Sequence, residues 1–171
     1  SSPSGDNTGS QLGRVLNLVA EHVEFAPCTE HNRVSTYADH IQSHHLGRFI
    51  ATVSGIELTG SPLPLNHQNA FPMVHRPRTQ DGGGPTTDQS PETQIERLTA
   101  WDDHSEKLVQ QNHPDIGWLF FDRDGNQQPD EGYSRSFQLM NVMEVHPIDP
   151  LLNPTRYMMS NGKAVNNQVC V

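Results

Sequence analysis

The sequence contains no apolar run that approaches the roughly 20 residues needed to cross a membrane. Apolar residues make up only 33% of the chain, which is low for a folded domain and suits a loop-rich globular enzyme better than a compact bundle. Basic residues are also scarce, with 11 against 20 acidic residues and a net charge of -9. A surface of that sign repels phosphate backbones. We therefore expect neither a membrane nor a nucleic acid as partner.

Cysteine is nearly absent, and the two that occur, Cys28 and Cys170, could form one disulfide bond or none. Cys28 lies in an apolar run, which favours a buried free thiol. The sequence also lacks the Gly-x-Ser-x-Gly signature of a serine nucleophile and any context typical of a catalytic cysteine. The run Asp81-Gly82-Gly83-Gly84 is not followed by the Lys-Ser/Thr pair of a phosphate-binding loop. Covalent catalysis and nucleotide binding therefore have no support.

What is present is an alternation of helical and extended patterns within a length typical of one domain. Helices are predicted at residues 11–22, 34–45, 91–105 and 133–140. Strands are predicted at residues 23–28, 49–58, 64–74, 107–111 and 142–145. Alternation of this kind predicts parallel strands with surrounding helices and long loops, an α/β fold.

Four of the predicted strands end at a side chain that can bind a metal ion, namely His31, Glu57, His67 and His113. Each histidine taken alone is more often structural, but parallel α/β folds place their active sites beyond the carboxyl ends of their strands. Imidazole and carboxylate ligands together suit zinc, iron or manganese. The four residues therefore predict a transition-metal site.

The residues around these side chains resemble the motifs of a known family. Thr29-Glu30-His31-Asn32 is similar to a Thr-Asp-His-Asn motif, and Gly55-Ile56-Glu57 is similar to a Gly-x-Glu motif. Asn66-His67 and Asn112-His113-Pro114 resemble two later histidine motifs. In this order, over about residues 5–147, they resemble the polymerase and histidinol phosphatase (PHP) domains, in their carbaryl-hydrolase-like branch.

This resemblance implies a single domain that is part of a distorted barrel of seven β/α units. It implies that Glu57, His67 and His113 hold one metal ion, and that His31 belongs to a neighbouring one. The implied activity is hydrolysis of an ester, amide or phosphoester in a small-molecule substrate by metal-activated water. The shared carboxylate of Glu57 would partly neutralise two adjacent cations.

The sequence departs from the family at both ends. The opening His-x-His motif would lie before Asp6, which itself is a weaker candidate ligand. The closing Asp-x-His motif is missing, because residues 147–171 contain no histidine; His146 is another weaker candidate. We therefore expect this chain to be part of a longer polypeptide and to have little or no activity by itself. A non-catalytic metal-binding module is the alternative.

A second candidate site is an acidic stretch with oxygen-bearing side chains at the spacing of a calcium loop. These side chains are Asp122, Asp124, Asn126 and Asp130. Its glycine is displaced and Tyr133 occupies the twelfth position, so a solvated acidic turn is the simpler interpretation. Bound calcium would make the chain a calcium-stabilised interaction module and would favour an extracytoplasmic location.

Overall fold

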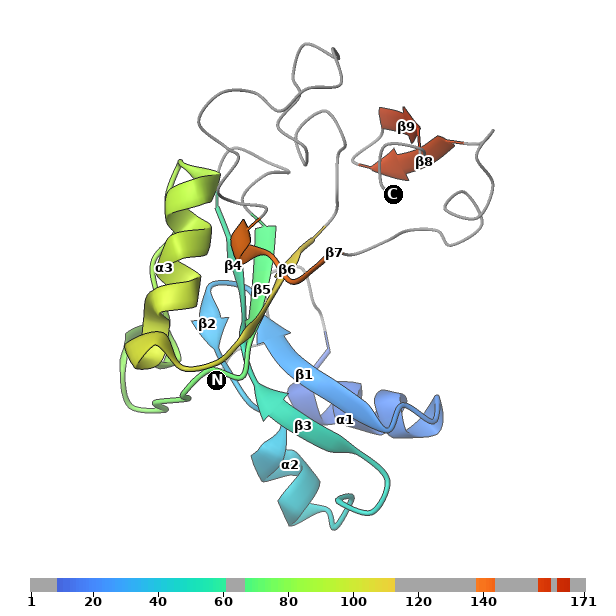
Figure 1. The fold of residues 1–171 in the computed structure, drawn as a ribbon. Coiled ribbons are helices and arrows are strands. Elements are labelled where there is room, and N and C mark those ends of the chain that lie inside the picture. The colour runs from blue at the N-terminus through green and yellow to red at the C-terminus, as the bar shows by residue number, and fades with distance from the viewer. Residues whose placement is uncertain (1–8, 61–66, 113–137, 144–156, 161–162, 167–171) are drawn as a thin grey trace.

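A computed structural model describes residues 9–60, 67–112, 138–143, 157–160 and 163–166 of the chain (Figure 1). The helical elements are α1 (Gln11–Ala20), α2 (Ala38–Ser43), the 3-10 helix η1 (Gln80–Gly83) and α3 (Pro91–His104). The strands before α3 are β1 (Phe25–Glu30), β2 (Arg33–Val34), β3 (Ala51–Ser54), β4 (Ile56–Thr59) and β5 (His67–Phe71). The strands after α3 are β6 (Leu108–Gln111), β7 (Val142–Met143), β8 (Tyr157–Ser160) and β9 (Lys163–Asn166).

The strands form small sheets of mixed direction. The first sheet has the order β2-β1-β3, in which β1 is antiparallel to β2 and parallel to β3. The second has the order β4-β5-β6-β7, with the first three strands antiparallel and β7 parallel to β6. Strands β8 and β9 form a separate antiparallel pair.

The prediction of parallel strands in part of a seven-unit barrel is therefore wrong, because the described residues form open, mixed sheets instead. The connection from β4 to β5, residues 60–66, explains the difference. Parallel neighbours need a crossover of a dozen or more residues, whereas a short connection joins antiparallel strands.

The single strand predicted over residues 49–58 is two strands that belong to different sheets. The break between β3 and β4 falls at Gly55. A Cβ atom at Gly55 would lie 2.8 Å from the carbonyl oxygen of Ala70 and 3.3 Å from that of Cys28. The backbones of three strands thus approach too closely here for any larger residue. A glycine at this point lets the chain pass from one sheet to the next.

Helices α1 and α3 lie close to their predicted positions. The Ser10 side chain caps α1 by accepting from the Gly13 amide at 3.0 Å, and Ser90 caps α3 through the Thr93 amide at 3.2 Å. The helix predicted over residues 34–45 is shorter, because Val34 belongs to β2 and only Ala38–Ser43 is helical. Within the described residues, no helix has the length and apolar character of a membrane span.

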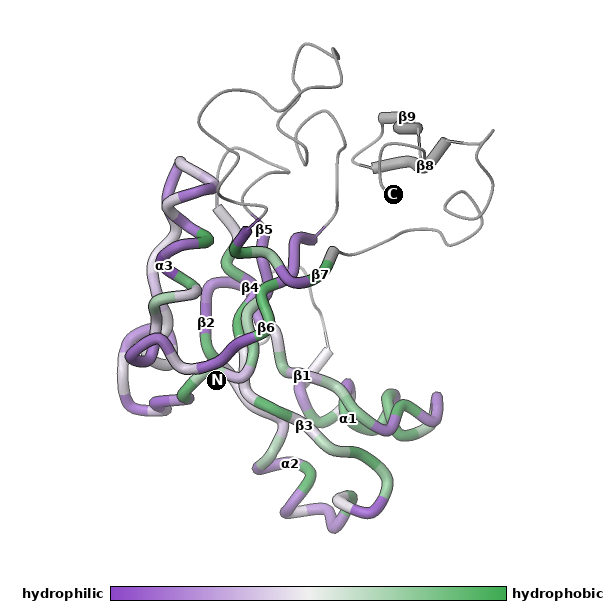
Figure 2. Tube along the Cα trace, viewed as in Figure 1, coloured by the Kyte–Doolittle hydropathy of each residue, from purple (hydrophilic) through white to green (hydrophobic). Residues whose placement is uncertain are grey.

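Two clusters of buried apolar residues form the core among the described residues. One contains Val15, Ala26, Cys28, Tyr37, Ile41 and Ile50, from α1, β1, α2 and the residues around them. The other contains Val34, Ile56, Leu58, Ala70, Met73 and Leu98, and joins β2, β4 and β5 to α3. Figure 2 shows that α3 is largely hydrophilic, with only scattered apolar residues. Along β4, Ile56 and Leu58 belong to the core that α3 covers. Glu57 lies between them in the sequence, so its side chain points to the opposite face of the strand.

Candidate functional site

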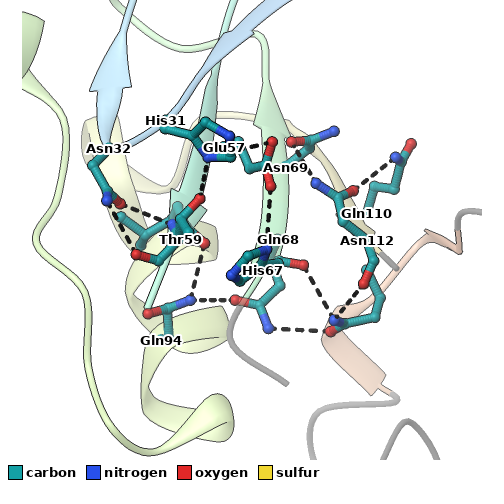
Figure 3. Close-up of polar contacts among 12 residues, drawn as sticks. His31, Asn32, Glu57, Thr59, His67, Gln68, Asn69, Gln94, Gln110 and Asn112 are labelled. Atoms are coloured by element: carbon teal, nitrogen blue, oxygen red, sulfur yellow. Dashed lines mark hydrogen bonds and ion pairs between the residues drawn. The ribbon is translucent and has the colours of Figure 1, made fainter. Parts of the chain in front are cut away.

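Three of the four predicted metal-binding side chains come together on the face of β4 and β5 that is turned away from α3 (Figure 3). The carboxylate of Glu57 lies between two imidazoles. Its Oε2 is 3.7 Å from Nδ1 of His31, and its Oε1 is 3.5 Å from Nδ1 of His67. The two imidazole rings are 6.4 Å apart and meet edge to face. The side chains of Glu57 and His67 are each 12% exposed and that of His31 is 24% exposed, so His31 is the more accessible histidine.

Strand pairing places these residues side by side. Thr59 pairs with His67 and Glu57 pairs with Asn69 in the antiparallel register of β4 and β5. Side chains two residues apart on a strand share a face, so Glu57 and His67 are diagonal neighbours on one face. His67 is the first residue of β5, and it reaches Glu57 because β5 runs opposite to β4. The sequence argument from parallel strand ends expected these residues to lie close together, and antiparallel pairing of β4 and β5 is what places Glu57 beside His67.

His31 joins the site from the other sheet. It follows the last residue of β1 and forms an isolated parallel bridge with Glu57. The next residue, Asn32, donates its backbone N–H to the Glu57 carbonyl at 2.7 Å. Asn32 has a φ of 54°, in the left-handed region that asparagine tolerates better than most residues. The turn at Asn32 therefore joins the end of β1 to β4 beside the carboxylate.

Two polar residues hold the His31 side of the site. Nδ1 of His31 lies 2.5 Å from Oγ1 of Thr59. The amide side chain of Asn32 donates to the Thr59 carbonyl at 3.0 Å and accepts from the Thr59 N–H at 2.8 Å. Asn32 thus pairs with the Thr59 backbone as a neighbouring strand would, and this fixes Thr59 next to the imidazole.

A network of buried amides supports His67 from the opposite face of the sheet (Figure 3). Gln94 of α3 donates to the side-chain oxygen of Gln68 at 2.5 Å, and Gln68 donates to that of Gln111 at 3.1 Å. Gln111 in turn donates to the backbone carbonyl of His67 at 3.1 Å, and the backbone N–H of Asn112 donates to the same carbonyl at 2.9 Å. The glutamines and Asn112 are at most 4% exposed. A chain of hydrogen bonds therefore links α3 to the first residue of β5.

The acidic residue of the first motif, Glu30, lies beside the site but has a different environment. Its side chain is 2% exposed, and Oε1 is 3.2 Å from Nη1 of Arg14 in α1. The same Arg14 nitrogen donates to the Tyr37 hydroxyl at 3.3 Å. Glu30 therefore ties α1 to β1, and it is Glu57 that supplies the carboxylate facing the histidines.

The spacing of the site atoms suits a shared metal ion at one pair of residues. Two ligand atoms about 2.1 Å from one tetrahedral ion lie about 3.4 Å apart, close to the 3.5 Å between Glu57 and His67. The 3.7 Å between Glu57 and His31 is longer, and the His31 nitrogen concerned is the one that contacts Thr59. Across the part of the chain that the structure describes, no three His, Cys, Asp or Glu side chains form a ready metal-binding group. A metal ion at Glu57 and His67 would therefore need a further ligand.

The other predicted ligands lie outside the described residues. These are His113, Asp6, His146 and the acidic-loop residues Asp122, Asp124, Asn126 and Asp130. They stay predictions, and so does calcium binding. The sequence argument missed the positions of Thr59 and the buried glutamines, since a threonine at a strand end and a glutamine in a helix give no distinguishing pattern. Asn32 did belong to a recognised motif.

Comparison with known proteins gives no relative: no protein-family model, no curated protein and no solved structure matches this chain. The resemblance to PHP domains therefore stays a prediction from the four short motifs.

Proposed function

We propose that this chain binds a divalent transition-metal ion, zinc, manganese or iron, between Glu57 and His67 and serves as part of a metal-dependent hydrolase. The observation that supports the proposal is that His31, Glu57 and His67 lie close together although they come from different elements. His31 follows β1, Glu57 lies in β4 and His67 begins β5. Glu57 offers one carboxylate oxygen to each histidine. Oε1 of Glu57 and Nδ1 of His67 have the spacing of two ligands of one ion, and His31 lies beside the other carboxylate oxygen.

Each residue has a distinct part in this proposal. Glu57 supplies the only carboxylate that faces both imidazoles among the described residues, and its charge would offset that of the cation. His67 supplies a neutral nitrogen ligand, held in place through its backbone carbonyl by Gln111 and Asn112. A bound ion of this kind lowers the pKa of a coordinated water and polarises the bond to be hydrolysed. His31 is the more exposed histidine, so a small-molecule ester, amide or phosphoester would approach beside it.

The alternative is a metal-binding module without turnover. It is favoured by the lack of a three-residue ligand group within the described residues, because catalytic zinc sites commonly have three protein ligands plus water. His113 is the residue that would complete such a set. Both versions predict metal binding and differ only in hydrolysis.

The first experiment measures metal content by mass spectrometry after equilibration with zinc and dialysis. We expect about one ion per chain, and no bound ion in Glu57→Gln, which loses the anionic ligand. Glu24→Gln is the matched control, since Glu24 is exposed and lies before β1. An equal metal content in Glu57→Gln and Glu24→Gln would refute the assigned site.

The second experiment measures turnover of aryl esters and phosphoesters with added zinc or manganese. If the chain is the partial hydrolase proposed here, we expect slow hydrolysis that His67→Ala abolishes and that His104→Ala, at an exposed position, leaves unchanged. Metal binding without any turnover would support the non-catalytic alternative. Turnover that survives His67→Ala would show that other residues act.

A further inference from the structure

Thr59 lies where it can decide which nitrogen of His31 is available for chemistry. Its Oγ1 is 2.5 Å from Nδ1 of His31, within hydrogen-bond distance, whereas Oε2 of Glu57 is 3.7 Å from the same nitrogen. A neutral imidazole has one N–H donor and one acceptor nitrogen, and the partner of one nitrogen sets the tautomer. Thr59 is the closer of the two groups at this nitrogen. Its hydroxyl can donate or accept, whereas the ionised carboxylate of Glu57 can only accept, so a proton on Nδ1 of His31 suits both neighbours.

The backbone of Thr59 is held independently of His31. Both its N–H and its carbonyl are bound by the Asn32 side chain, at 2.8 Å and 3.0 Å. Thr59 also pairs with His67 across the sheet. Its hydroxyl is thus held in place by a backbone that is fixed on two sides. A group that bonds to the second ring nitrogen of a metal-binding histidine orients the ring in the same way.

We propose that Thr59 is a positioning residue that accepts a hydrogen bond from Nδ1–H of His31, and so leaves Nε2 as the nitrogen through which His31 acts. The role of that nitrogen as a ligand or proton acceptor rests on the proposed function, but the tautomer itself does not. The two histidines then have different roles. His67 faces Glu57 through Nδ1, while Nδ1 of His31 is held by Thr59.

The test is nitrogen-15 NMR of the histidine side chains in the metal-free chain, which distinguishes the two neutral tautomers. In the wild type we expect His31 to be the Nδ1–H tautomer. Thr59→Ser keeps the hydroxyl and should keep this tautomer, whereas Thr59→Val and the smaller Thr59→Ala should shift His31 to the Nε2–H form. Thr99→Val is the matched control, because the Thr99 hydroxyl bonds to a helix carbonyl, that of Ile95. It should leave the His31 signals unchanged.

Addition of Zn²⁺ to the same samples separates this inference from the proposed function. In the wild type and in Thr59→Ser, zinc should change the signal of Nδ1 of His67, and any change at His31 should be at Nε2. If neither His31 nor His67 responds to zinc but the tautomers follow the expected pattern, the metal site is wrong and the role of Thr59 is supported. If His31 has the same tautomer in the wild type, Thr59→Val and Thr59→Ala, the role of Thr59 is refuted. That conclusion holds whether or not the histidines respond to zinc.

Discussion

At the scale of single residues, Gly55 determines where Glu57 can lie. The chain leaves the first sheet at Ser54 and enters the second at Ile56. Between them, the N–H of Gly55 donates to the carbonyl of Ser35 at 3.3 Å, and the carbonyl of Gly55 accepts from the N–H of Ser35 at 3.1 Å. Backbone atoms of neighbouring strands surround its α-carbon. The glycine of the Gly-x-Glu motif thus has a structural role two residues before the carboxylate.

Substitution of this glycine should be costly. Gly55→Ala would place a methyl group 2.8 Å from the Ala70 carbonyl and should lower the free energy of unfolding by about 1–3 kcal/mol, as overpacking typically does. Gly47→Ala is the control, since its nearest neighbour would be a side-chain carbon of Ile41 at 3.9 Å. Urea denaturation measures both. Equal midpoints for the two variants would contradict the close approach at Gly55.

At the scale of elements, α3 supports the site through a polar link as well as through the apolar core. Gln94 donates both to Gln68 and to the backbone carbonyl of Leu58, and its own oxygen accepts from the Asp88 N–H at 3.0 Å. It is fully buried. Buried amide networks of this kind fix one arrangement of their elements when every member is bonded.

Removal of the Gln94 amide should therefore destabilise the chain. Gln94→Met keeps a similar volume but leaves buried partners without their hydrogen bonds, which typically costs about 1–3 kcal/mol. We expect a lower urea midpoint with an unchanged slope. The exposed Gln89→Met should have little effect. A Gln94→Met variant as stable as Gln89→Met would mean that the network adds nothing to stability.

At the scale of the whole molecule, the core around α1 should make folding sensitive to high pH. Burial raises the pKa of the Cys28 thiol from 9.0 to about 12 and that of the Tyr37 hydroxyl from 10.0 to about 12. The folded state then binds more protons than the unfolded state above pH 9 for Cys28 and above pH 10 for Tyr37. Stability is therefore complete below pH 9 and falls as the pH rises toward 12.

Between its unfolded and folded pKa values, each group lowers the free energy of unfolding by about 1.4 kcal/mol per pH unit. Cys28→Ala should remove the contribution of the thiol and flatten the fall in unfolding free energy between pH 9 and pH 10, while lowering stability at pH 8. Denaturation at stepped pH measures this. A pH dependence identical in the wild type and Cys28→Ala would show that the thiol is not held protonated. The free, buried state predicted for Cys28 from its apolar run is confirmed.

Sequence patterns predicted part of this molecule well and part of it poorly. The amphipathic run of α1 and the Ser-Pro-Glu start of α3 are local signals, and both helices lie near their predicted positions. Strand direction depends on contacts between distant residues, so the antiparallel pairing of β4, β5 and β6 was not apparent from periodicity. His31, Glu57 and His67 were brought together through short motifs, whereas the Thr59–Asn32 pair depends on two turns that no pattern specifies.

The most direct test of the central claim is anomalous diffraction at the zinc edge from crystals equilibrated with zinc. The account predicts a peak about 2.0–2.2 Å from a carboxylate oxygen of Glu57 and a nitrogen of His67. Exposed histidines can also bind zinc and compete with the proposed site. His44 and His45, which directly follow α2, are an exposed pair of this kind. Zinc found only at such surface histidines, with none at Glu57, would contradict the proposal.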